Sequence, residues 1–217
     1  MADLGGLRFL AEPAFVIPWY AVGALGAAFA VHDELRGPGR ELPKALKQCW
    51  PIIIFFFSAI GLGLYLWASR PPLGETPKKV LASVMHCVGG DGLGIVTAMV
   101  IARLAGFDFW QEYWFEYAVG FAFGWFIFQY EAMRKMASGP LETLWMGGRA
   151  EFFSMLTVMA GMGVVMGCVT PMVAGQQPKP DTFAFWGFAA LGLLAGAALT
   201  VPMNFWLVKI GWKHGQG

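Results

Sequence analysis

Three side chains with useful chemistry stand within six residues of one another in the segment MHCVGGDGLG, residues 85–94. His86 and Cys87 are ligands that soft metal ions such as copper favour. Asp91 can carry a proton, or it can support a metal site. On a helix Cys87 and Asp91 share one face, whereas His86 points about 100° away. The plainer alternative is a closely packed helix whose polar groups bond to other helices.

A methionine stripe could complete a copper site. Its members are Met155, Met159, Met162 and Met166. On a helix this spacing puts all four on one face, and Glu151 extends that face by one turn. Such stripes are usually core packing, because methionine fills irregular gaps. Thioethers also select Cu(I), so copper is the cofactor to consider. The candidate ligands are His86, Cys87, Asp91, Met155 and Met159. They require the segments around residues 86 and 155 to be neighbours.

Other polar side chains interrupt apolar segments, namely Glu116, Gln129 and Asn204. An ionisable side chain within a membrane span faces protein and has a partner. We therefore expect Asp91 to be buried beside Asn204, Thr97, a water or a cation.

Glycines four residues apart let helices approach closely, and two such pairs occur here, Gly90 with Gly94 and Gly120 with Gly124. We expect the segment around Gly94 to pack on the segments around Gly120 and Asn204. The four glycines within residues 89–94 could instead break their helix and free its backbone for binding. Close packing is the commoner use, and both interpretations stay open.

The elements that position these residues are apolar helices. The chain of 217 residues is 57% hydrophobic and 13% charged, against roughly 25% charged in soluble domains. About six runs are long enough to cross a membrane. We predict an all-α, polytopic integral membrane protein, with one transmembrane domain over residues 1–217. The spans are expected at about residues 13–31, 51–68, 80–102, 110–130, 152–174 and 183–212.

The orientation follows from the lysines and arginines, which are enriched in cytoplasmic loops. Six crossings put both termini on one side, with nine Lys and Arg residues against six on the other. This excess favours cytoplasmic termini in a bacterial inner membrane.

Several short motifs carry a family resemblance. They are WP at residues 50–51, HC followed by glycines at 86–90, FQY at 128–130 and VPMNFWLVKIGWK at 201–213. From Pro51 to Lys213 the chain resembles the bacterial membrane family named domain of unknown function 4396. The resemblance implies an all-helical membrane domain and no activity. In that family's pattern a second cysteine stands where this chain has Asp91, which implies that a two-thiol metal site is unavailable here.

Three functions remain open. The first is a non-catalytic accessory or structural subunit of a larger membrane complex, whose partners are lipid and other membrane subunits. The second is copper or other soft-metal handling through His86 and Cys87. The third is a small transporter with a mid-membrane site at Asp91. A net charge of +1 suggests no nucleic-acid partner, and no hydrolase, phosphate-loop or haem motif argues for an enzyme.

Overall fold

In the computed structural model, which describes residues 5–70, 76–134 and 137–213, every regular element is a helix. The α-helices are α1 (Pro13–Arg36), α2 (Lys44–Ala68), α3 (Thr76–Ala105), α4 (Phe109–Ala122), α5 (Tyr130–Met133), α6 (Pro140–Val164), α7 (Thr170–Ala174) and α8 (Phe183–Lys209). Two 3₁₀-helices are η1 (Gly5–Ala11) and η2 (Pro38–Glu41), and two π-helical segments are η3 (Phe123–Gln129) and η4 (Val165–Val169).

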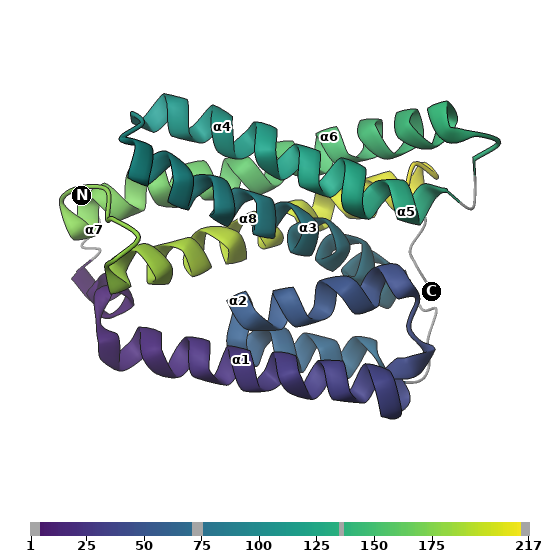
Figure 1. Cartoon of the computed structure of the whole chain (residues 1–217), viewed down its shortest axis with the longest axis horizontal. Coiled ribbons are helices and arrows are strands. Elements are labelled where there is room, and N and C mark those ends of the chain that lie inside the picture. The colour runs from purple at the N-terminus through teal and green to yellow at the C-terminus, as the bar shows by residue number, and fades with distance from the viewer. Residues whose placement is uncertain (1–4, 71–75, 135–136, 214–217) are drawn as a thin grey trace.

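The expected all-α membrane fold is confirmed. Five helical stretches are long and apolar enough to cross a membrane, namely Pro13–Arg36, Leu46–Ala68, Pro77–Ala105, Pro140–Ala174 and Phe183–Lys209. The sixth expected span lies in α4, η3 and α5, which follow one another without a break from Phe109 to Met133. The helices run side by side along the long axis of the molecule (Figure 1).

Helix α2 folds back on itself at Ser58. Ser58 has φ 52° and ψ −131°, a left-handed φ that is uncommon for a residue with a side chain. The rings of Trp50 and Tyr65 lie 5.6 Å apart, although the same residues in a straight helix would be separated by about 22 Å. The two arms pack against each other, and Trp19 of α1 donates to the Phe56 carbonyl at the tip, at 2.9 Å. The stretch expected to cross as residues 51–68 is therefore a hairpin that enters and leaves at one end of the bundle.

The hairpin changes the positions of the termini. The Asp33 carboxylate near the end of α1 accepts from Tyr65 at 2.7 Å and from Arg70 at 3.0 Å, so the second arm ends where the first began. Beyond it, α3, α4–α5, α6–α7 and α8 run in alternating directions. The N- and C-terminal ends lie at opposite ends of the bundle (Figure 1). The expectation that both termini share a side counted α2 as a full crossing, whereas a hairpin returns to the end of the bundle at which it began.

Helix α3 is continuous from Thr76 to Ala105, so its glycines do not break it. A Cβ on Gly94 would lie 2.8 Å from the Gly120 Cα, and one on Gly90 would collide with the Phe128 ring. The glycines thus let α4 and η3 approach α3 at backbone distance.

Candidate functional site

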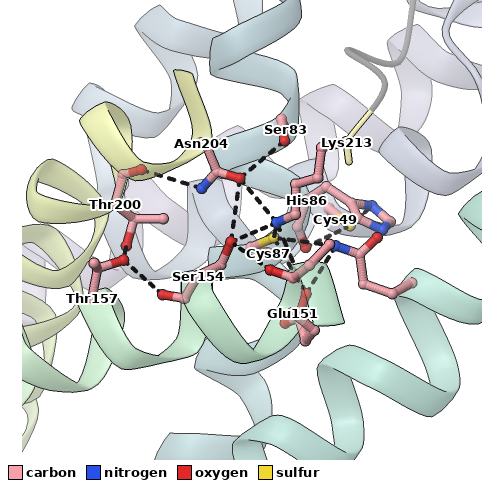
Figure 2. Close-up of polar contacts among 12 residues, drawn as sticks. Cys49, Ser83, His86, Cys87, Glu151, Ser154, Thr157, Thr200, Asn204 and Lys213 are labelled. Atoms are coloured by element: carbon pink, nitrogen blue, oxygen red, sulfur yellow. Dashed lines mark hydrogen bonds and ion pairs between the residues drawn. The ribbon is translucent and has the colours of Figure 1, made fainter. Parts of the chain in front are cut away.

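A buried polar cluster lies in the half of the bundle in which α8 ends. It joins α3, η3, α6, α8 and the segment after α8, and each of its side chains is at most 4% exposed. Figure 2 shows most of its contacts. Its members, hereafter the polar cluster, are Ser83, Cys87, Asp91, Gln129, Glu151, Ser154, Asn204 and Lys213.

Lys213 reaches the cluster because the chain turns back after α8. Gly211 adopts φ 73°, the left-handed conformation that commonly follows a helix end. The N–H groups of Trp212 and Lys213 then both donate to the Leu207 carbonyl, at 3.0 and 3.1 Å. The Trp212 ring is fixed beneath the Arg149 guanidinium, 4.6 Å from it. Lys213 was expected at the membrane surface, as one of the nine basic residues counted on one side. A glycine just past a helix end was a signal for such a turn.

The Lys213 ammonium uses all three of its N–H donors. They go to Cys87 Sγ at 2.5 Å, Ser154 Oγ at 2.7 Å and Asn204 Oδ1 at 2.9 Å. Its Nζ also lies 4.0 Å from Glu151 Oε2. An ammonium has three donors and no acceptor, so this geometry fits the charged form.

The Glu151 carboxyl lies between two sets of neighbours. Its Oε2 atom accepts from Gln129 Nε2 at 2.8 Å and from the Cys87 thiol at 3.5 Å. Its Oε1 atom points towards Asp91, beside Gly124, where a Cβ would collide with carboxyl oxygens of both acids. Gly124 therefore makes room for two carboxyl groups that lie side by side.

Asp91 is 0% exposed, so it is buried among protein groups as expected. The partners that the sequence suggested are engaged elsewhere. Thr97 is exposed and donates to the Leu93 carbonyl, whereas Asn204 contacts Ser83, Ser154 and Lys213. In the part of the chain that the structure describes, no N–H or hydroxyl donor reaches either Asp91 oxygen. Its polar neighbour is Glu151, which was expected only to extend the methionine stripe.

His86 and Cys87 face different elements. His86 Nδ1 lies 3.4 Å from Cys49 Sγ on the first arm of α2, and its ring meets Phe128 edge-on at 5.9 Å. Cys87 contacts Lys213, Gln129 and Glu151 instead. The methionine stripe is buried as well; the Met155 methyl packs on Gly120 and the Met162 sulfur on Gly192.

These positions do not fit a copper site. An ammonium beside the Cys87 sulfur occupies the approach that a metal cation needs and repels it. Over residues 5–70, 76–134 and 137–213, no group of three His, Cys, Asp or Glu side chains could hold a metal ion.

Glu116 belongs to a separate buried group. It lies on the same face of α4 as Gly120, towards the other end of the bundle, and is 3% exposed. Its neighbours are Glu112 and Arg103 rather than the polar cluster.

A family model described as domain of unknown function (DUF4396) matches residues 77–213, more than half of the chain. The match begins at α3 rather than at Pro51 as expected, and it ends at Lys213. It therefore contains the whole polar cluster, while α1 and the α2 hairpin precede it. Comparison with curated proteins and with solved structures gave no match.

Proposed function

This chain belongs to the family described as domain of unknown function 4396, and we propose that it moves protons across a bacterial inner membrane. The observation that carries the proposal is the pairing of Asp91 with Glu151, both 0% exposed, beside a single ammonium. The pair is the central proton-binding site. Of the three functions that the sequence left open, this is the transporter.

The charges of the group support proton binding. One ionised side chain at mid-membrane costs about 2.5–3.5 kcal/mol on insertion scales. Two carboxyl groups in contact cannot both be ionised, since each charge disfavours the other. One proton between Asp91 and Glu151 leaves one negative charge, which Lys213 neutralises. The proton also gives the pair the hydrogen-bond donor that two carboxylates lack. Loss and gain of that proton change the net charge of the bundle interior.

The two rival functions have weaker support. Soft-metal handling needs the Cys87 sulfur, which Lys213 occupies. An accessory subunit would use packing glycines for contacts with other subunits, but glycines of this chain serve contacts within it, such as Gly94 with Gly120 and Gly161 with Gly196.

The orientation of the protein follows from the distribution of charge. Lysines and arginines are enriched on the cytoplasmic side of membrane proteins. Only Arg8, Arg103 and Lys179 lie towards the N-terminal end of the bundle among the described residues. The eleven towards the other end are Arg36, Arg40, Lys44, Lys47, Arg70, Lys78, Lys79, Arg134, Arg149, Lys209 and Lys213. Lys135, counted from the sequence, lies outside the described residues. We therefore place the polar cluster in the cytoplasmic half and the N-terminal end on the periplasmic side.

Reconstitution in liposomes tests the proposal. The purified protein is incorporated into vesicles that contain a pH-sensitive dye, and a potassium diffusion potential drives protons inward. We expect wild-type vesicles to acidify, and Asp91→Asn to lower the rate by about 100-fold, as loss of a positioned proton-transfer group does. Asp181→Asn is the matched control, because Asp181 is exposed.

Other outcomes would overturn the proposal. An unchanged rate in Asp91→Asn would exclude the pair as the proton site. Flux that appears only with a co-purifying subunit in fixed stoichiometry would favour the accessory role. Stoichiometric copper that is lost in Cys87→Ser would favour metal handling.

A further inference from the structure

We propose that Glu116, with Glu112 and Arg103, forms a second proton-binding site at the periplasmic end of the bundle, which exchanges protons with the Asp91–Glu151 pair along α4. This inference rests on the proposed function and names the route by which protons reach the central pair.

Arg103 and Glu112 form the charged half of this second site. Arg103 Nε donates to both Glu112 carboxylate oxygens, at 2.6 and 2.5 Å. The other guanidinium nitrogens donate to the Pro178 carbonyl at 2.8 Å and to Gln177 Oε1 at 2.9 Å. The arginine therefore balances the charge of Glu112 and leaves none for a second carboxylate.

Glu116 is the uncompensated half. It is 3% exposed, and no N–H or hydroxyl group of the described residues donates to its Oε1 atom. Its carboxyl lies within hydrogen-bonding distance of Glu112. It also lines a cavity of about 10 Å³ with Tyr113, a size that holds about one water molecule. The arrangement of two carboxyl groups and one cation repeats that of Asp91, Glu151 and Lys213.

The surroundings of Glu116 favour a protonated carboxyl. The charged and titratable groups that face it are Glu112 and Tyr113 on α4 and Arg103 on α3. Where α6 and η4 line the cavity beside Glu116, they contribute the uncharged side chains Met162 and Met166. With Arg103 already paired, a second carboxylate here would be a buried and unbalanced charge.

Tyr117, the residue after Glu116 on α4, is the polar group nearest in sequence that also senses the central pair. Gly124, beside the central pair, follows Glu116 by eight residues on the same helix face, a rise of about 12 Å. That is too far for one hydrogen bond. The Tyr117 hydroxyl is buried, has no partner within the described residues and lies within electrostatic reach of Asp91 and Glu151. A hydroxyl can accept one proton and release its own, so we assign Tyr117 as the relay that passes a proton from Glu116 to Asp91.

The test measures both flux and protonation. In the same vesicles we expect Glu116→Gln to lower proton flux by about 100-fold, and Tyr117→Phe to lower it as well. Glu142→Gln is the control, because Glu142 is exposed. Infrared spectra of the wild type at mildly alkaline pH should contain two protonated-carboxyl bands. Labelling of glutamate with ¹³C should shift at least one of them, and a shifted band should be lost in Glu116→Gln and retained in Asp91→Asn.

The outcomes separate this inference from the function on which it rests. Loss of flux in Asp91→Asn with normal flux in Glu116→Gln would keep the central site and remove the second one. Loss of flux in neither variant would remove both. If Glu116→Gln does not fold, the infrared spectrum of the ¹³C-labelled wild type still tests the second site. A spectrum with no glutamate-derived band would overturn that site.

Discussion

A lysine inside a membrane bundle needs its charge balanced, and Lys213 shows how this chain does so. Its three donors meet Cys87, Ser154 and Asn204, and the charge of Glu151 lies 4.0 Å away. Removal of one partner of a buried ion pair leaves the other uncompensated, which costs about 3–5 kcal/mol. At the scale of single residues, the positive charge of Lys213 is therefore balanced by the negative charge of Glu151 within the polar cluster.

We predict that Lys213→Met destabilises the protein by about 3–5 kcal/mol in detergent, as measured by thermal unfolding. Lys209→Met is the matched control, because Lys209 is exposed. The double variant Lys213→Met with Glu151→Gln should recover much of the loss, since neither charge then remains. Equal melting temperatures for Lys213→Met and Lys209→Met would contradict the ion pair.

At the scale of elements, close helix contacts place the carboxyl pair. The approach of α3 to α4 depends on Gly94, whose missing side chain faces the Gly120 backbone. Both Gly124 and Gln129 belong to the π-helical segment η3, a type of local widening often found at functional sites. The helix contacts and η3 together bring residues of three helices to one point.

Gly94→Ala tests this contact. The added methyl would lie 2.8 Å from the Gly120 Cα and 3.1 Å from the Val119 carbonyl, so helices must separate at a cost of about 1–3 kcal/mol. Gly63→Ala is the matched control, because nothing lies within 4 Å of its added methyl. We expect a lower melting temperature for the first variant only; equal values would mean that α3 and α4 are less tightly packed.

At the scale of the whole molecule, the hairpin in α2 decides the topology. With α2 reversed at Ser58, we expect the chain to cross the membrane an odd number of times, so that its ends face opposite sides. The same reversal moves the basic loop at residues 36–47 to the side of Lys213. The sequence-based excess of nine basic residues over six thereby becomes eleven over three among the described residues.

Epitope tags at the two ends test this topology. We expect protease added to spheroplasts to remove an N-terminal tag and to leave a C-terminal tag intact until the cells are lysed. Protection of both tags would mean that α2 crosses the membrane fully, as the hydropathy alone suggested.

The sequence by itself determined the fold class and identified four of the polar residues that lie inside the bundle. Long apolar runs have no stable alternative to helices in lipid, and a polar residue within such a run must face protein. Asp91, Glu116, Gln129 and Asn204 were therefore recognised without a structure.

The tertiary structure alone decided which of these residues meet and where the chain reverses. Cys87 and Lys213 are 126 residues apart, and Cys87 and Glu151 are 64 apart. Such contacts depend on the rotation and separation of packed helices, which hydropathy does not encode. The reversal at Ser58 was hidden for the same reason, because two apolar arms folded together have the same composition as one straight crossing.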